Sequence, residues 1–307
     1  MEKKDYSKLK VWLDGRIVDY RDAKVPILTH SLQYGSGIFE GIRAYKTNKG
    51  RIIFRLRDHV KRFLNSAKIC YMNLEYNEDE IFNAIVKVVK ENDIDPCYIR
   101  PFAFYNTDQI GLSAYNKKTS VFIAALPFGA YFGSGKEKGI KCKISSWHRI
   151  NSDIVSVRAK SSGNYVNSIL GNFEAKYAGF DDAIFISENG YVAEGSAENI
   201  FIVNNNKLIT PDEGADILFG ITRDSLIKIA KTIGIDIEER QIHKDELYTA
   251  DEVFFSGTAA EITPIINIDG HKIGNEKLGP ITKMLSDKFY DIINGNDEIF
   301  NDWLTYV

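Results

Sequence analysis

The sequence predicts an α/β protein with mixed sheets and two domains, and three observations lead to that prediction. The chain has 307 residues, enough for two domains of ordinary size or for one large α/β unit. Strand-like and helix-like hydrophobic patterns follow one another along it. Residues 129–139 hold four glycines, which favours an interdomain loop. We therefore expect a smaller N-terminal domain over residues 1–128 and a larger C-terminal domain over residues 140–307.

Local patterns in the first half predict strands and two amphipathic helices. Residues 10–20 alternate around Asp14-Gly15, a strong signal for a β-hairpin. The first helix has apolar residues at helical spacing, namely Leu56, Val60, Phe63 and Ala67. The second helix covers residues 78–90, with Asn77 as its expected N-cap. Further strands are expected at residues 38–45, 51–54, 97–105 and 120–126.

The second half alternates between the two kinds of pattern. Strands are expected near residues 141–145, 182–187, 200–203, 236–241 and 252–255. Helices are expected near residues 164–178, 221–233 and 279–293. The sequence contains no internal repeat or low-complexity segment.

Composition narrows the possible partners. The 39 basic and 42 acidic residues give a formal charge of -3 without a basic block, so neither nucleic acid nor an anionic membrane is expected as a partner. The three cysteines, at positions 70, 97 and 142, are far apart and odd in number, which argues against a disulfide framework and a metal knuckle. The most apolar stretch, residues 121–128, is too short to span a bilayer. We expect a cytoplasmic enzyme.

Several catalytic and binding motifs are incomplete. Residues 35–40, Gly-Ser-Gly-Ile-Phe-Glu, resemble the start of a dinucleotide fingerprint, but Glu40 stands at the sixth position and a strand-like run follows. Gly135-Lys136 lacks the serine or threonine that a phosphate loop requires. The five histidines have no ligand-like spacing, so no metal site is expected, and no Gly-x-Ser-x-Gly elbow is present.

Lys160 is the strongest candidate for a catalytic residue. It lies in the stretch 158–165, Arg-Ala-Lys-Ser-Ser-Gly-Asn-Tyr, at the mouth of a predicted helix. Small neighbouring residues let a ligand approach the backbone, which suits Schiff-base chemistry better than a solvated helix face does. The alternative is that Lys160 is an ordinary exposed lysine without a catalytic role, and three downstream stretches argue against that alternative.

Those stretches contain groups that complement a lysine-bound cofactor. Glu194 is expected at the end of a strand, where a carboxylate could hold a pyridine nitrogen protonated; the alternative is a surface ion pair. Gly220, with the N–H groups of Ile221 and Thr222 at the start of a helix, suits a phosphate; the alternative is an ordinary N-cap. The small residues at 256–260 could admit a ligand or simply end a strand.

Together these stretches resemble the fold-type IV pyridoxal-phosphate-dependent aminotransferases, and most closely the branched-chain amino acid aminotransferases. The class signature is matched by Glu194-x-Ser196-x-x-Asn199, then Leu208-x-Thr210, then Leu218-x-Gly220-Ile221-x-Arg223. Segments 34–43, 98–101, 127–131 and 256–262 resemble the branched-chain members. The likeness extends from Trp12 to about Phe289.

The resemblance implies a role for each matching residue. Lys160 would hold pyridoxal 5'-phosphate covalently and shuttle the substrate proton. The cofactor would further be bound by Arg62, Gly220, Ile221, Thr222 and Thr258 at its phosphate end, by Tyr165 at its ring hydroxyl and by Glu194 at its ring nitrogen. The substrate would be bound by Tyr34, Phe39, Tyr98, Arg100, Phe128, Tyr131, Thr258 and Ala259, with Arg100 taking the distal carboxylate of glutamate.

The implied activity is transamination of leucine, isoleucine and valine with 2-oxoglutarate by a ping-pong mechanism. The larger domain would bind the cofactor, and the protein would be a homodimer or higher homo-oligomer with its active site near the subunit interface. D-amino acid transaminases and aminodeoxychorismate lyases share the signature and remain alternatives, as does a binding protein that kept the fold without catalysis. Two departures are the absence of prolines from residues 150–157 and Phe128 where some relatives carry tryptophan.

Overall fold

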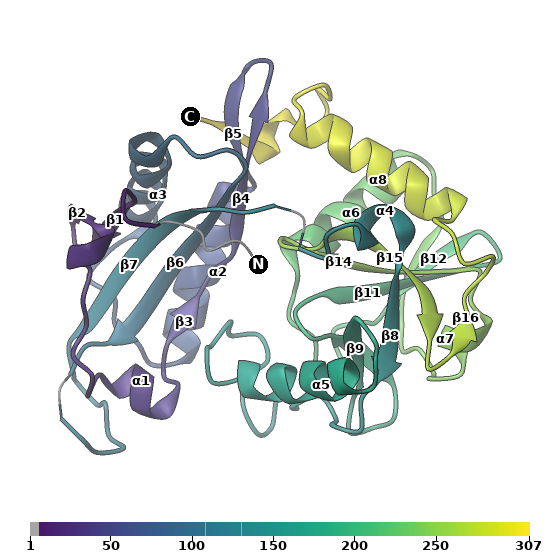
Figure 1. Ribbon diagram of the computed structural model, residues 1–307, viewed down its shortest axis with the longest axis horizontal. Helices are drawn as coiled ribbons and strands as arrows, with labels where there is room; N and C mark the ends of the chain where they lie inside the picture. Colours follow the sequence, from purple (N-terminus) through teal and green to yellow (C-terminus); the bar gives the residue numbers. More distant parts are fainter. Residues whose placement is uncertain (1–5, 108, 130) are drawn as a thin grey trace. The chain divides into compact units, whose positions relative to one another are not determined.

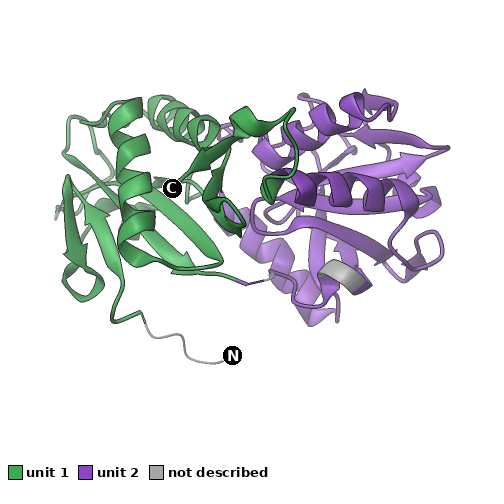
Figure 2. Cartoon of the chain, turned by 90° about the horizontal axis from the view of Figure 1, so that it is seen from above, with its two compact units in different colours: residues 1–128, 159–163, 293–307 green, residues 129–158, 164–292 purple. Residues whose placement is uncertain are grey.

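The computed structural model describes residues 6–107, 109–129 and 131–307. The chain forms two compact units, shown in different colours in Figure 2. Unit 1 comprises residues 1–128, 159–163 and 293–307, and unit 2 comprises residues 129–158 and 164–292. Residues 1–5 and Asp108 of the predicted first domain and Ala130 of the predicted interdomain loop lie outside the described residues.

The described part of unit 1 contains an eight-stranded sheet in which the strand pairs are antiparallel (Figure 1). The order is β17-β5-β4-β6-β7-β1-β2, and β3 pairs with β6. The strands are β1 (Lys10–Leu13), β2 (Arg16–Asp19), β3 (Ile38–Phe39), β4 (Ile42–Thr47), β5 (Gly50–Phe54), β6 (Cys97–Tyr105), β7 (Thr119–Pro127) and β17 (Leu304–Tyr306). The hairpin predicted around Asp14-Gly15 is confirmed by the pairing of β1 with β2.

One expectation for this sheet is wrong. The strand expected over residues 38–45 is divided at Glu40-Gly41 into β3 and β4. Pro101 of β6 lies opposite this break, and its carbonyl accepts the N–H of Glu40 at 2.9 Å. Because proline has no N–H to donate in return, the ladder is interrupted there.

The helices of unit 1 are α1 (His30–Tyr34), α2 (Leu56–Ile69) and α3 (Glu78–Asn92), with short 3-10 turns at Tyr20–Asp22 and Asn301–Trp303. The apolar face predicted for α2 is buried as expected. Asn77 caps α3, since its side chain accepts the N–H of Glu80 and the Glu80 side chain accepts the N–H of Asn77. Both helix predictions are confirmed.

Unit 2 contains a nine-stranded mixed sheet in its described residues, in the order β10-β9-β8-β15-β14-β11-β12-β13, with β16 paired to β15. The strands are β8 (Ile140–Ile144), β9 (Asp182–Ile186), β10 (Val192–Gly195), β11 (Asn199–Asn204), β12 (Lys207–Thr210), β13 (Ile237–Glu239), β14 (Glu252–Gly257), β15 (Glu261–Ile268) and β16 (His271–Lys272). The pairs β8–β9, β8–β15 and β12–β13 are parallel. The prediction of mixed sheets is thus confirmed.

The helices of unit 2 are α4 (Gly135–Lys138), α5 (Tyr165–Tyr177), α6 (Ile221–Thr232), α7 (Glu246–Thr249) and α8 (Pro280–Ile293), the last of which ends at the first residue of the C-terminal part of unit 1. The three helices predicted in this half correspond to α5, α6 and α8. The short helix α4 lies within the predicted interdomain loop. Phe201 and Phe254 stack in the core at 5.0 Å between ring centroids, and both are fully buried.

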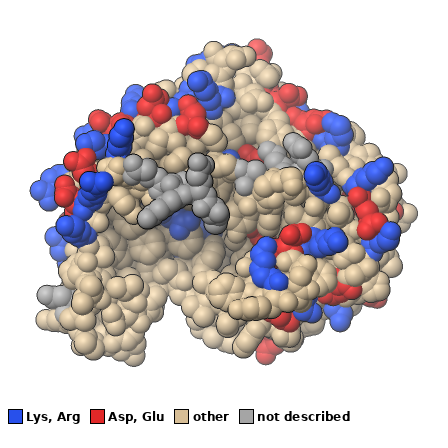
Figure 3. All heavy atoms as spheres, viewed as in Figure 1, with Lys and Arg blue, Asp and Glu red and all other residues tan. Residues whose placement is uncertain are grey.

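The surface carries mixed charge. On the face shown in Figure 3, Lys and Arg side chains are interspersed with Asp and Glu side chains, in keeping with the small net charge. Within residues 6–107, 109–129 and 131–307, no helix has both the length and the apolar composition needed to cross a membrane.

Candidate functional site

Lys160 belongs to unit 1 and is held against the end of β3 by its main chain. Its carbonyl accepts the N–H of Phe39 at 3.0 Å, and its N–H donates to Ser66 Oγ at 3.0 Å. The next residue, Ser161, forms a β-bridge with Ile38. Lys160 Nζ lies 5.1 Å from the centroid of the Phe39 ring. The lysine is therefore positioned by a strand end and is only partly exposed, unlike a lysine on a solvated helix face.

The predicted substrate residues of β6 form a cluster with Phe39. Arg100 Nη2 donates to the hydroxyl of Tyr98 at 2.9 Å. The Arg100 guanidinium carbon lies 4.4 Å from the ring centroid of Phe39 and 5.3 Å from that of Tyr98. The Tyr98 ring packs on Phe128 at 4.8 Å between centroids. Unit 1 thus brings Lys160, Phe39, Tyr98, Arg100 and Phe128 into one chain of contacts, in which the Arg100 guanidinium lies between the rings of Phe39 and Tyr98.

Arg62 and Tyr34 are the other predicted site residues of unit 1. Arg62 lies on α2, and its guanidinium contacts the carboxylate of Glu40, with Nε 2.6 Å from Oε1 and Nη2 2.8 Å from Oε2. Tyr34 is the last residue of α1, is 42 % exposed, and packs its ring on His30 at 4.6 Å. The sequence motifs assigned no role to Glu40, which Arg62 contacts through two hydrogen bonds.

In unit 2, Glu194 is a buried carboxylate with an arginine partner that the sequence analysis missed. Arg149 Nη2 lies 2.8 Å from Glu194 Oε1, and Arg149 Nη1 donates to Ser168 Oγ of α5 at 3.1 Å. The side chains of Arg149 and Glu194 are 8 % and 6 % exposed. The pair is far apart in sequence and outside any motif, so no local signal could have found it.

The second oxygen of Glu194 is tied to the loop before α6. Asn199 Nδ2 donates to Glu194 Oε2 at 3.0 Å and to the carbonyl of Leu218 at 2.9 Å, and the N–H of Leu218 donates to the same Glu194 oxygen at 3.1 Å. A Cβ added to Gly220 would lie 1.9 Å from Asn199 Oδ1, so this position requires glycine. These contacts explain why Glu194, Asn199 and Gly220 occur together in the sequence signature.

The start of α6 is fixed from its other side by Arg223. This buried arginine donates to Thr210 Oγ1 at 3.3 Å, to the Pro211 carbonyl at 2.7 Å and to Glu239 Oε2 at 2.8 Å. Gly220 is the N-cap residue, and its lack of a side chain leaves this end without a side-chain cap. A helix N-terminus without a side-chain cap is a favourable place for an anion. Thr222, in the first turn, is buried.

The remaining predicted residues of unit 2 lie at element ends. Thr258 and Ala259 form the turn between β14 and β15, and Tyr165 is the first residue of α5. The turn is followed by Glu261, which has φ 55° and accepts the Tyr290 hydroxyl at 2.5 Å.

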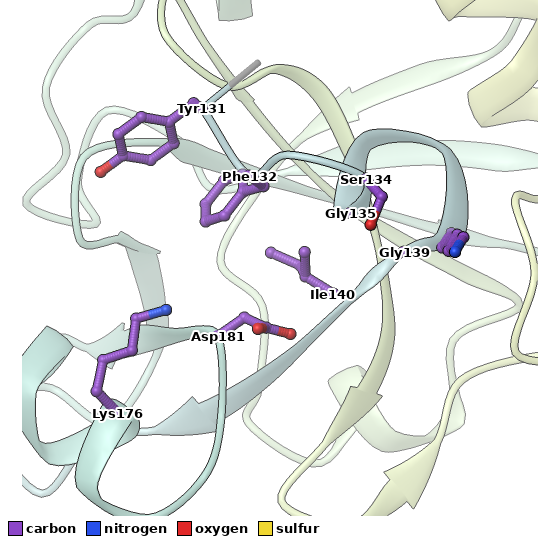
Figure 4. Close-up of a pocket in the computed structure, with 9 residues that line it drawn as sticks. Tyr131, Phe132, Ser134, Gly135, Gly139, Ile140, Lys176 and Asp181 are labelled. Carbon is purple, nitrogen blue, oxygen red and sulfur yellow. The ribbon is translucent and has the colours of Figure 1, made fainter. Parts of the chain in front are cut away.

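Tyr131 lines a pocket of about 400 Å³ (Figure 4). The pocket is also lined by Phe132, Ile140, Lys176 and Asp181. Among the described lining residues, Tyr131 is the one predicted to bind substrate. In the described part of the chain, no group of three or more His, Cys, Asp or Glu side chains is arranged to hold a metal ion.

Comparison with known proteins identifies the family. The family model described as amino-transferase class IV matches residues 37–268. A branched-chain-amino-acid aminotransferase of Pseudomonas aeruginosa is 45% identical over 298 residues, covering 97% of each chain.

Solved structures give the same result. A branched-chain aminotransferase from Thermoproteus uzoniensis with norvaline is 46% identical and has a TM-score of 0.93. The alignment covers 97% of this chain and 98% of that chain. The T.th. branched-chain amino acid aminotransferase complexed with N-(5'-phosphopyridoxyl)-L-glutamate is 40% identical and has a TM-score of 0.93. The alignment covers 98% of this chain and 99% of that chain. The buried Glu194–Asn199–Gly220 contacts and these full-length similarities agree: the chain belongs to the class IV aminotransferase family.

Proposed function

We propose that the protein transfers amino groups between branched-chain L-amino acids and 2-oxoglutarate, giving branched 2-oxo acids and L-glutamate by a ping-pong cycle. The observation that carries the proposal is the cluster around Arg100, because it offers aromatic rings and the Arg100 guanidinium to the same ligand. A transaminase of this kind must accept both an apolar and an acidic side chain. Relatives with norvaline and with a glutamate derivative of the cofactor lend support.

Pyridoxal 5'-phosphate is the cofactor of this family, and the side chains present suit it chemically. When bound, it withdraws electrons from the substrate Cα and so makes the Cα proton removable. We propose Lys160 as the residue that holds it covalently and Glu194 as the partner of its ring nitrogen. Tyr165 is proposed for the ring hydroxyl. The phosphate is assigned to Arg62, Ile221, Thr222 and Thr258, with Gly220 allowing the turn.

Lys160 also has the proton-transfer role in the proposal. Its Nζ accepts the proton from the substrate Cα and later delivers it, a general acid-base function that is typically worth about 10²–10⁴-fold in rate. The aromatic ring of Phe39 beside Nζ excludes water from one side of the amine. The substrate carboxylate is assigned to the Thr258–Ala259 turn, and the apolar side chain to Tyr34, Phe39, Tyr98, Phe128 and Tyr131.

The absorption spectrum of the cofactor-loaded protein tests this function. L-leucine and L-glutamate, added separately, should each remove the visible band of the lysine-bound cofactor, while D-alanine should not. A response to D-alanine alone would indicate a D-amino acid transaminase. Release of pyruvate from aminodeoxychorismate without an amino acceptor would indicate a lyase, and a protein that takes up no cofactor would be a binding protein.

Arg100 gives a sharper prediction about the acidic substrate. Arg100→Ala should slow the half-reaction with glutamate about 10–100-fold more than the half-reaction with leucine, because only glutamate brings a second carboxylate to the guanidinium. Arg100 Nε is buried and has no hydrogen-bond partner in the described residues, which fits an anion supplied by a ligand. Single-turnover absorbance would measure both rates. The exposed Arg57→Ala is the control, and equal losses with both substrates would show that Arg100 is structural.

We further propose a homodimer or higher homo-oligomer with the active site near the subunit interface. Helix α5, labelled in Figure 1, exposes an apolar stripe that a second copy could cover. The stripe consists of Val166, Ile169, Leu170, Phe173 and Tyr177. Sedimentation equilibrium measures the mass, and a monomer at micromolar concentration would refute this part of the proposal.

The proposed substrates are amino acids and 2-oxo acids, and the proposed location is the cytoplasm. The cysteines of the described chain are thiols, and burial raises the pKa of the Cys97 thiol to about 12. We also retain the proposal that residues 1–128 and 140–307 are the functional domains, with residues 129–139 as their loop and the cofactor assigned to the larger one.

A further inference from the structure

Unit 1 contains a buried ion cluster formed by Glu40, His59 and Arg62. Glu40 is 0 % exposed and follows Phe39, whose N–H donates to the carbonyl of Lys160. His59 is 1 % exposed and lies on α2, the helix that carries Arg62 and packs beside β3 (Figure 1). Buried charges are costly unless they are paired, so a carboxylate kept in this position calls for a specific role.

The Glu40 carboxylate accepts four hydrogen bonds. Arg62 Nε contacts Oε1 at 2.6 Å, and Arg62 Nη2 contacts Oε2 at 2.8 Å, in a two-point pair that fixes the guanidinium plane. His59 Nδ1 lies 2.7 Å from Oε2, and the N–H of Gly41 donates to Oε2 at 3.2 Å. Each carboxylate oxygen is therefore satisfied, and Arg62 is held at two points.

The charge states in the cluster agree with this geometry. Burial raises the pKa of the Glu40 carboxyl, but the Arg62 charge and hydrogen bond, helped by His59, lower it by more, so the net pKa lies well below its usual range. Burial lowers the pKa of His59, so its ring is neutral at pH 7. An ionised carboxylate can only accept, and therefore His59 carries its proton on Nδ1 and donates it to Glu40.

The same face of α2 also fixes the backbone of the lysine. His59, Arg62 and Ser66 are spaced three and four residues apart, which places them on one side of the helix. Ser66 Oγ accepts the N–H of Lys160 at 3.0 Å. The end of β3 and this face of α2 thus set both the main chain of Lys160 and the guanidinium of Arg62.

We propose that Glu40, braced by His59, is a positioning residue that holds Arg62 in the orientation in which it binds the cofactor phosphate. This inference rests on the proposed function, in which Arg62 is a phosphate ligand. A guanidinium has five N–H donors, and the pair with Glu40 uses two of them. An arginine fixed in advance loses less side-chain entropy when the phosphate binds, which increases affinity.

The test compares two ligands that differ by the phosphate. Dissociation constants of the apoprotein would be measured for pyridoxal 5'-phosphate and for pyridoxal, which lacks the phosphate, and expressed as a ratio. Glu40→Gln should reduce the preference for the phosphorylated ligand by about 10-fold or more while leaving pyridoxal binding nearly unchanged. Glu78→Gln is the matched control, because it removes an exposed carboxylate that pairs with Arg57 of α2. It should keep the wild-type ratio.

Arg62→Ala separates this inference from the proposed function. If Arg62→Ala keeps the wild-type preference, Arg62 is not the phosphate ligand and the site assignment fails. If Arg62→Ala lowers the preference but Glu40→Gln does not, or if Glu40→Gln weakens both ligands equally, Glu40 is not a positioning residue. Should Glu40→Gln fail to fold, His59→Gln decides the matter. His59→Gln should lower the preference for pyridoxal 5'-phosphate over pyridoxal about threefold, because one hydrogen bond typically contributes about that much. An unchanged ratio of the two dissociation constants would overturn the proposal.

Discussion

Lys160→Ala is expected to abolish turnover and covalent attachment of the cofactor. The variant has no amine to bond with the cofactor aldehyde or to accept the substrate proton, and both functions are assigned to Nζ. The fold should persist, because the hydrogen bonds from residue 160 to Phe39 and Ser66 involve its main chain, which alanine keeps. Intact mass after borohydride reduction would measure attachment, and product formation would measure turnover.

The control for this variant is Lys68→Ala, which removes an exposed lysine from α2. It should retain both attachment and turnover. Full activity in Lys160→Ala, or a reduced cofactor attached elsewhere in the chain, would disprove the assignment of Lys160. Loss of thermal stability would instead show that the lysine side chain supports the fold of unit 1.

Arg149→Met is expected to be the most destabilising of the substitutions considered. It leaves Glu194 buried without its charged partner, and breaking a buried ion pair from one side typically costs about 3–5 kcal/mol. It also removes the bond to Ser168 that connects Glu194 to α5. Urea unfolding of the cofactor-free protein would measure the change in the free energy of unfolding.

Two comparisons make the Arg149 result interpretable. Lys228→Met breaks an exposed pair with Asp224 and should cost less than about 1 kcal/mol. The double variant Arg149→Met with Glu194→Gln removes the uncompensated charge and should recover part of the loss, since neighbouring substitutions are not additive. If Arg149→Met lowers the free energy of unfolding no more than Lys228→Met does, then solvent reaches the Arg149–Glu194 pair.

The elements that the sequence predicted well are those specified by nearby residues. Asn77 and Glu80 cap α3 reciprocally, and both are within three positions of each other. The hairpin at Asp14-Gly15 likewise depends on its own turn. By contrast, the break between β3 and β4 depends on Pro101, about 60 residues away, and no local pattern near Glu40 could indicate it.

The candidate site shows the same division. Local residue patterns singled out Lys160 and Glu194, the resemblance added Arg62, and the roles of all three remain predictions. The residues that hold them, Glu40 and Arg149, could not be inferred, because each meets its partner through the tertiary fold. The spacing of apolar residues in the sequence indicates which side of a helix or strand is buried. It does not indicate which polar side chains of different elements pair with one another.

The pairing of β17 with β5 determines when unit 1 can be completed during synthesis. Thr305 pairs with Ile53, so the edge of β5 stays open until the ribosome has made residues 304–306. Residues 159–163, which carry Lys160, also join unit 1 only after residues 129–158 of unit 2 have emerged. A fragment of residues 1–128 therefore lacks both the closing strand β17 and the segment that carries Lys160, so unit 1 is completed late in synthesis.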